Sequence, residues 1–339
     1  MKKRSVKFIV LALVLSMLFV LVACANNSNN SSKSDGPPKV ASLFSIPDPR
    51  NAGGWDRAQM AGLDVLSNDF GWEVNIAESV PYPRISEIVL GFVDQGYDIV
   101  IYPDAGMMES YMELPADNPD TLFIMCSIID EIPQVPNAAA YAPDFHEYGM
   151  LVGLAMGRAS QTNKIGIIGG APIPVLQRVF SGVIEGAKVA NPNIEATVLW
   201  AGDWTDTAKH REISMLLTNE GCDMLFTVTG PADKGVYEVA EATGALVVGY
   251  TWDMYNDNPN AFLTSLIVNT PSFYKQLAED FLAGKIKNEI VSLDRQYFYF
   301  ADFRGSVPKD VEDDIRELAR KFLAGEISVP NTIHEDIMN

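Results

Sequence analysis

The chain has 339 residues, a formal net charge of −19 and 47% hydrophobic residues. Such an acidic protein is unsuited to nucleic acids or anionic lipid surfaces, because binding to either requires patches of Lys and Arg. The length is sufficient for one large domain or two medium domains with proper cores.

The first 24 residues are typical of an exported protein. A basic start precedes an apolar run from Phe8 to Val20, and Leu21-Val22-Ala23-Cys24 follows it. This order is that of a bacterial secretory signal peptide over residues 1–23. The last four residues resemble the lipobox of bacterial lipoproteins, so we predict that Cys24 is lipidated and becomes the mature N-terminus. A transmembrane anchor is the alternative, but the apolar run is shorter than the roughly 20 residues that a spanning helix needs.

A polar segment separates this start from the rest of the chain. Residues 24–37 are rich in Asn and Ser, a composition that predicts a flexible linker. Removal of residues 1–23 takes the formal net charge from −19 to −23. We therefore expect the lipid alone to hold the protein at the extracytoplasmic face of the cell membrane.

From Lys39 onward, short β-rich runs alternate with amphipathic segments, and this pattern indicates βαβ units on a parallel sheet. In the first half, the expected strands are 40–46, 73–77, 99–102 and 122–126, and the expected helices are 55–70, 84–95 and 107–114.

The pattern then starts again after a helix expected over residues 144–160. The strands expected in the second half are 164–168, 196–200, 224–228, 246–250 and 262–267, and the helices are 174–190, 207–219, 232–243, 272–283 and 311–323. Two successive arrays predict an α/β protein with two Rossmann-like lobes joined by a multi-strand hinge. We assign residues 38–143 with about 268–295 to lobe 1, and residues 144–267 with about 296–339 to lobe 2.

Ligands of open parallel sheets bind beyond the carboxyl ends of the strands. The turns after the strands are therefore the candidate site, and two lobes would bring two such edges together around a ligand.

In the first lobe, a Gly-Gly turn leads into Trp55-Asp56 at the start of a helix, and Tyr102-Pro103-Asp104 ends the third strand. A glycine turn allows close backbone approach and leaves N–H groups free at the helix start. Trp55 is suited to stacking on a flat ligand, and the alternative is that it packs as a hydrophobic staple.

In the second lobe, aromatic and acidic residues recur in the corresponding turns. The candidate residues there are Pro172, Trp204, Gly230, Thr251 and Asp253. Rings beside carboxylates suit a flat ligand with N–H donors. Asp203 and Asp206 are open to the alternative role of helix caps, which we favour for Asp206.

No pattern of catalysis is evident. The three histidines have no metal-ligand spacing with Cys or with one another, and no nucleophile elbow is present. His210 lies in a charged stretch that is typical of a solvated helix face. Cys126 and Cys222 sit in apolar runs, where a lone cysteine is usually a small core residue. A disulfide between them is the alternative in an exported protein. We expect no enzyme, no metal and no cofactor.

Several segments resemble the basic membrane protein (BMP) family, whose members are solute-binding lipoproteins and purine or nucleoside receptors of ABC importers. The resemblance covers about residues 40–332. It is carried by Gly53-Gly54-Trp55, residues 137–157, Ile173-Pro174, residues 204–209, Val248-Gly249-Tyr250 with Asp253-Met254, Leu263-Thr264-Ser265, and residues 323–330. The resemblance implies a type I periplasmic-binding-protein fold with a ligand between the lobes.

The chain departs from the nucleoside-binding branch of this family. Trp55-Asp56 stand where that branch has Phe-Asn, Thr251 stands in place of an Asp for the ribose hydroxyls, and Val268 in place of a Lys. These departures argue against ribose recognition, and the Gly53-Gly54-Trp55 and Trp204 features look more like the branch associated with free purine bases such as adenine. Transferred by position, Trp55 would stack on the base, Trp204 and Tyr141 would complete an aromatic wall, and Asp253 or Thr251 would be a polar partner.

The resulting hypothesis is a monomeric, membrane-tethered receptor that captures a purine base or nucleoside and presents it to an ABC permease. Alternatives are a sensory receptor or adhesin of the same fold, a binder of another small polar solute, and a surface hydrolase.

Overall fold

The computed structural model describes residues 36–127, 129, 131–293, 295–328 and 330–338. The predicted signal peptide, Cys24 and most of the predicted linker lie outside the described residues. From Pro38 onward the chain forms one compact unit. Of the described helices, none combines the length and apolar character that crossing a membrane requires.

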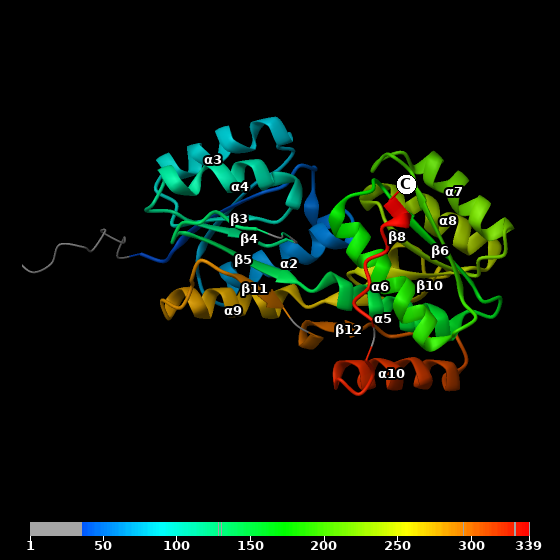
Figure 1. Cartoon of the computed structure of the whole chain (residues 1–339). Coiled ribbons are helices and arrows are strands. Elements are labelled where there is room, and N and C mark those ends of the chain that lie inside the picture. The colour runs from blue at the N-terminus through cyan, green and yellow to red at the C-terminus, as the bar shows by residue number, and fades with distance from the viewer. Residues whose placement is uncertain (1–35, 128, 130, 294, 329, 339) are drawn as a thin grey trace, which may run out of the picture. The chain divides into compact units, whose positions relative to one another are not determined.

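The first sheet has six strands in the order β11-β5-β4-β3-β1-β2, all parallel to their neighbours (Figure 1). The strands are β1 (Lys39–Leu43), β2 (Glu73–Ala77), β3 (Ile99–Tyr102), β4 (Leu122–Met125), β5 (Ala138–Pro143) and β11 (Ile290–Leu293). The helices packed on this sheet are α2 (Gly54–Asn68), α3 (Ile85–Asp94), α4 (Met108–Glu113) and α9 (Thr270–Leu282).

Alternate residues of the central strands face two different helical layers. Val40 packs in one cluster with Met60 of α2 and Phe273 of α9, and Ala41 packs in another with Val89 of α3 and Tyr111 of α4. Because helices cover both faces, the inner strands β3 and β4 are continuous apolar runs rather than alternating ones.

The second sheet repeats this arrangement in the order β12-β10-β9-β8-β6-β7. The strands are β6 (Lys164–Gly169), β7 (Glu195–Trp200), β8 (Met224–Val228), β9 (Leu246–Thr251), β10 (Phe262–Val268) and β12 (Phe298–Phe300). Only β12 runs antiparallel to its neighbour within the described pairs.

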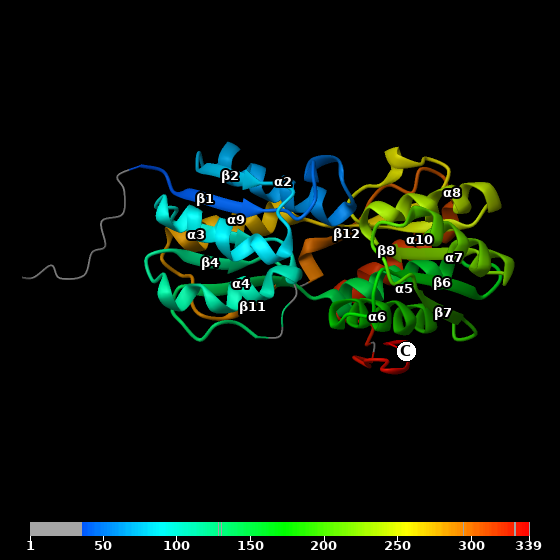
Figure 2. The ribbon, with the colours of Figure 1, turned by 90° about the horizontal axis from the view of Figure 1, so that it is seen from above.

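Helices cover both faces of this sheet as well. One layer contains α5 (Phe145–Ala159), α6 (Pro174–Ala190) and α10 (Lys309–Leu323), and the other contains α7 (Thr207–Asn219) and α8 (Asp233–Thr243). Figure 2 shows α6 and α8 on opposite sides of β8. The expected α/β architecture is thus confirmed, and most predicted elements agree with the structure within two residues.

Three strands were not predicted. The sequence of β5 is rich in alanine and ends in Pro143, while β11 and β12 are only four and three residues long. Alanine and proline are depleted in strands, and short runs carry little periodicity. β11 and β12 are edge strands next to the crossings, whereas β5 pairs with β4 on one side and β11 on the other.

The chain crosses between the sheets three times: between Pro143 and Phe145, between Val268 and Thr270, and between Leu293 and Phe298. Backbone bonds join the crossings, because Asp144 N–H donates to the Leu293 carbonyl at 3.2 Å and Asn269 N–H donates to the Tyr297 carbonyl at 2.8 Å. The multi-strand hinge is thus a set of adjacent, hydrogen-bonded segments.

Helices α5 and α6 pack through facing glycines spaced four residues apart. These are Gly149, Gly153 and Gly157 on α5, and Gly182 and Gly186 on α6. A Cβ atom at Gly153 would lie 2.1 Å from the Val183 carbonyl oxygen, and one at Gly186 would lie 2.2 Å from the Met150 carbonyl oxygen. The helices meet backbone to backbone, so this layer has no room for side chains at these positions.

Gly153→Ala should therefore lower the free energy of unfolding by about 1–3 kcal/mol, the usual cost of overpacking. Gly91→Ala in α3 is the matched control, because a Cβ there meets nothing within 4 Å; it should raise stability by about 0.5–1 kcal/mol. Urea unfolding followed by circular dichroism measures both, and equal effects of the two substitutions would contradict the packing described.

Candidate functional site

Both sheets share the order 2-1-3-4-5 in their first five strands, so each has a switch point between its first and third strands. Ligands of such sheets bind at the carboxyl ends of the strands beside this point. The relevant loops follow β1 and β3 in the first sheet, and β6 and β8 in the second. Most of the residues predicted for the site lie in or next to these loops.

Trp55 lies in the first turn of α2, half-buried. Its indole Nε1–H donates to the Pro103 carbonyl oxygen at 2.8 Å, and its ring centroid lies 5.5 Å from that of Phe145. The donor of the indole is thus used within the protein, and the ring is held between the loop after β3 and the start of α5. Trp55 has a packing role here, and the part of its ring that stays exposed is its apolar surface.

Asp56 follows in the same helical turn, and burial together with nearby Asp104 raises its pKa to about 7. Near neutral pH this carboxyl group therefore exists in both protonation states. It can donate a hydrogen bond when protonated and accept one when ionised. Asp56 is the most chemically versatile group at this edge of the first sheet.

Asp104 is fixed by two donors from the first sheet. Its Oδ1 accepts from Gly106 N–H at 2.8 Å and its Oδ2 accepts from the Tyr82 hydroxyl at 2.5 Å. Burial and the neighbouring Asp104 raise the pKa of Tyr82 to about 12, so this hydroxyl remains a donor. The pair orients the Asp104 carboxylate after β3.

Tyr82 was not predicted as a site residue. It begins the short helix η2 (Tyr82–Arg84), is 49% exposed, and its ring occupies the space that a side chain at Gly106 would need. The signal in the sequence is Pro81-Tyr82-Pro83 directly after the second strand's loop. Two prolines fix the backbone on either side of the ring.

The start of α2 touches the second sheet through backbone atoms. A Cβ at Gly53 would lie 3.2 Å from Gly230 Cα, and one at Gly54 would lie 2.0 Å from the Tyr250 carbonyl oxygen. Gly230 itself has φ +64°, a left-handed conformation that glycine adopts without strain. This contact brings the loop after β1 to the ends of β8 and β9.

Thr251 lies beneath that contact. Its φ is 58°, its side chain is fully buried, and its N–H donates to the Tyr148 hydroxyl at 2.9 Å. Its Oγ1 has no partner among the described residues and lies 3.1 Å from where a Cβ at Gly54 would be. A β-branched residue rarely adopts this backbone conformation, and such outliers cluster at functional sites.

Trp204 lies at the carboxyl end of the second sheet. Its ring covers the backbone of Gly170, where a Cβ would come within 2.4 Å of the ring, and the side chain is 39% exposed. One ring face is supported by the protein while part of the ring faces solvent. Pro172 is exposed in the same loop, between β6 and α6.

The acidic residues on either side of Trp204 have local roles. Asp206 is the N-cap of α7 and accepts from Lys209 N–H at 3.0 Å, which confirms the favoured interpretation. Asp203 accepts from the N–H groups of Thr205 and Asp206, both at 2.6 Å. These two carboxylates organise the turn that carries Trp204.

The expectation for His210 is wrong. Its side chain is fully buried rather than solvated, and its Nδ1 lies 2.7 Å from the Asp206 carbonyl oxygen. A buried His in a charged stretch is explained by α8, which packs against this face of α7. The charged neighbours Lys209 and Arg211 occupy the exposed positions on either side.

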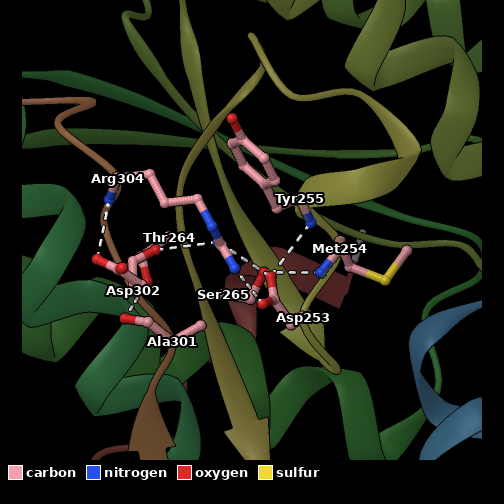
Figure 3. Close-up of polar contacts among 8 residues, drawn as sticks. All are labelled: Asp253, Met254, Tyr255, Thr264, Ser265, Ala301, Asp302 and Arg304. Atoms are coloured by element: carbon pink, nitrogen blue, oxygen red, sulfur yellow. Dashed lines mark hydrogen bonds and ion pairs between the residues drawn. The ribbon is translucent and has the colours of Figure 1, made fainter.

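Asp253 is already paired. Figure 3 shows its carboxylate facing the Arg304 guanidinium, with Oδ2 at 2.5 Å from Nη2, while Oδ1 accepts from Tyr255 N–H at 3.3 Å. Arg304 also lies 4.2 Å from the centre of the Tyr255 ring. In this arrangement the Asp253 carboxylate stabilises the loop between β9 and β10.

Two predicted tyrosines lie in the core of the first sheet. The Tyr102 hydroxyl is 3.2 Å from Ser110 Oγ, and the Tyr141 hydroxyl donates to Asp280 at 3.1 Å. Both side chains are almost completely buried. The structure therefore does not bring them together with Trp55 or Asp56 at the rim.

Cys126 and Cys222 are free and buried, as expected for core residues. Burial raises the pKa of the Cys126 thiol to about 12 and that of the Cys222 thiol to about 11. Within the described ranges, no group of three or more His, Cys, Asp or Glu side chains is placed to hold a metal ion.

Residues 39–332 match the family model described as ABC transporter substrate-binding protein PnrA-like. Similar proteins include a CD4+ T-cell-stimulating antigen of Listeria innocua, 24% identical over 97% of this chain and 99% of the relative. Another is the ABC transporter nucleoside-binding protein BmpA of Lactococcus lactis, 23% identical over 98% of this chain and all of the relative.

Among solved structures, an ABC transporter solute-binding protein from Conexibacter woesei superposes with a TM-score of 0.71 at 21% identity, covering 88% of this chain and all of the other. At this identity the likeness shows the fold alone. The fold is therefore that of the periplasmic binding proteins, as predicted.

Asp56→Asn should make stability less dependent on pH. The folded-state pKa of Asp56, about 7, lies above its ordinary value of 3.8, so the folded state binds the proton more tightly and Asp56 costs stability as pH rises from about 4 to 7. Each pKa unit corresponds to about 1.4 kcal/mol. The melting temperature of the variant, relative to the parent, should therefore rise more at pH 8 than at pH 5.

Asp206→Asn is the matched control, since Asn also caps helices. Its melting temperature relative to the parent should be the same at pH 5 and pH 8. An Asp56→Asn gain that is the same at pH 5 and pH 8 would contradict the burial of this carboxyl group.

Proposed function

Because the chain belongs to the PnrA-like family of ABC transporter substrate-binding proteins, we propose that its ligand is a purine base of the adenine type. A small-molecule ligand and a permease partner follow from the family role. The proposed site lies where the first turn of α2 meets the carboxyl ends of the two sheets. A purine nucleoside is the alternative ligand.

The observation that carries this proposal is the grouping of Trp55, Asp56 and Asp104 at the end of β3. The Trp55 N–H is bound to Pro103, so this residue offers ring surface rather than a donor. Asp56, whose pKa is about 7, offers either a donor or an acceptor. An adenine edge presents a ring nitrogen beside an amino group, which is an acceptor beside a donor.

Trp204 supports the same proposal from the second sheet. Its ring is backed by Gly170 and part of it is exposed, which is what a stacking platform needs. Stacking of a base on an aromatic side chain is worth about 1–3 kcal/mol. Two such rings with one pair of carboxyl groups are consistent with micromolar affinity, about −8 kcal/mol.

A base is favoured over a nucleoside by the chemistry of two positions. Thr251 carries no charge and is buried beneath α2, and Val268 is buried in the core of the second sheet. Neither side chain offers the charged group that would bind ribose hydroxyls. BmpA of Lactococcus lactis is named for nucleoside binding, so both ligand types belong in the test.

Adenine should raise the melting temperature of the domain beginning near Asp35, and adenosine should do so less. At a hundredfold excess over Kd, a ligand adds about 2.7 kcal/mol of stability, equivalent to a shift of roughly 4 °C for about 300 residues with an unfolding entropy of about 2.1 cal/mol/K per residue. Differential scanning fluorimetry with bases, nucleosides, pyrimidines and sugars measures this. Stabilisation by a sugar or an amino acid with no effect of any purine would refute the proposal.

Trp204→Ala should weaken adenine binding at least about tenfold, because it removes the stacking platform. Tyr299→Ala is the matched control: Tyr299 is an aromatic residue of β12 with 51% exposure and no proposed ligand contact. Isothermal titration calorimetry compares them. Equal affinities of the parent and Trp204→Ala, with the fold intact, would remove Trp204 from the site.

We further propose that a lipid on Cys24 tethers the receptor to the membrane, on the basis of the lipobox-like Leu21-Val22-Ala23-Cys24. Cys24→Ala should abolish incorporation of labelled fatty acid and lower the share of the protein in the membrane fraction, because it removes the thiol to which the lipid would be attached. Fractionation with metabolic fatty-acid labelling tests this, and labelling that persists in Cys24→Ala would contradict the tether.

A further inference from the structure

Arg57 and Asp257 form an ion pair between elements that belong to different sheets. Arg57 lies in α2, which packs on the first sheet, and Asp257 ends the short helix η6 (Tyr255–Asp257) between β9 and β10 of the second. The two charged groups are 3.1 Å apart, and Arg57 Nη2 also lies 3.4 Å from the Asn51 carbonyl oxygen.

This pair lies at a cavity of about 390 Å³ that both sheets line, through Asn51, Gly53 and Arg57 on one side and Gly230, Lys234 and Asp257 on the other. The Arg57 and Asp257 side chains are 19% and 31% exposed. Partial burial of this kind leaves a charge pair less screened than on an open surface.

The pair is also next to the backbone contacts that join the sheets. Gly53 meets Gly230 and Gly54 meets Tyr250, within four residues of Arg57. Those contacts depend on shape alone and carry no side-chain charge. Arg57 and Asp257 add a directional, charge-assisted contact at the same place. We call this place, where Gly53 and Gly54 meet Gly230 and Tyr250, the seam.

We propose that the Arg57–Asp257 pair is a latch that holds α2 against the second sheet and slows release of the ligand. The inference rests on the proposed ligand site, because a ligand contacted by both sheets leaves when they separate. A contact made only when the sheets meet favours that conformation by its own interaction free energy. Arg57 and Asp257 are thus positioning residues that need not touch the ligand.

Other ion pairs in the chain provide controls. Arg50 and Asp64 are 2.6 Å apart, but both lie on elements of the first sheet, η1 (Pro49–Asn51) and α2. Removal of this pair takes away a similar charge interaction without affecting the seam. If loss of charge alone matters, substitutions in either pair will change the sheet separation and the release rate. If Arg57–Asp257 is a latch, only substitutions in that pair will.

The first experiment needs no ligand and is therefore independent of the purine proposal. In the domain beginning near Asp35, which lacks Cys24, spin labels at Asp94→Cys, at the end of α3, and Asn219→Cys, at the end of α7, report the separation of the sheets. Both positions are exposed, and Cys126 and Cys222 are buried. Arg57→Gln should shift the distance distribution away from that of the parent, and Arg50→Gln should leave it unchanged. Identical distributions in the parent and Arg57→Gln would overturn the latch.

The second experiment measures adenine release by stopped flow. Arg57→Gln and Asp257→Asn should each increase the release rate about two- to fivefold, the range expected for a partly exposed pair. The double variant should release no faster than either single variant, because both remove the same interaction. Added salt should speed release from the parent more than from the variants.

Additive effects in the double variant, or equal effects of Arg50→Gln and Arg57→Gln, would overturn the proposal. Because the substituted residues lie on different sheets, a folding defect in one variant leaves the other as a test. If no purine binds at all, the proposed function fails while the distance measurement still decides on the latch.

Discussion

The contact between the first turn of α2 and the end of β9 is the constraint on which the candidate site depends. The space that a Cβ at Gly54 would need is filled by the Tyr250 carbonyl oxygen, so the two backbones can meet only if this residue is glycine. The same turn carries Trp55 and Asp56. Their position relative to the second sheet therefore depends on this glycine.

Several features near this contact depart from ordinary backbone and side-chain behaviour. Thr251 adopts φ 58°, and its Oγ1 is buried without a partner in the described part of the chain. Burial and a neighbouring carboxylate raise the pKa of Asp56 to about 7. Strain and perturbed pKa values of this kind gather where a protein binds or reacts. Their concentration around one turn supports a ligand site there, on grounds separate from family membership.

Much of the architecture could be predicted from the sequence because buried parallel strands are continuous apolar runs separated by amphipathic helices. The strands β5, β11 and β12 were missed because β5 is rich in alanine and the other two have only four and three residues, so their pairing is decided by neighbours distant in the chain. His210 was misjudged for a related reason: its burial depends on α8, which its own charged neighbours do not reveal.

For the candidate site, the sequence indicated loops at the carboxyl ends of the strands but not the partners of each side chain. Asp253 was predicted as a ligand contact, yet Arg304, 51 residues away, pairs with it. Tyr141 was predicted for an aromatic wall, yet the alternation of β5 turns it toward Asp280 of α9. Tyr82 escaped notice because its role depends on contact with Asp104 after another strand.

Photochemical labelling with 8-azidoadenine, followed by peptide mass spectrometry, tests the proposed purine site most directly. Adenine-protectable labels should appear in the loops at the strand ends, within residues 44–57, 103–106, 170–174 or 200–206. Protectable labelling confined to outer helices such as α3 or α10, or labelling that adenine does not reduce, would contradict a purine site between the two sheets.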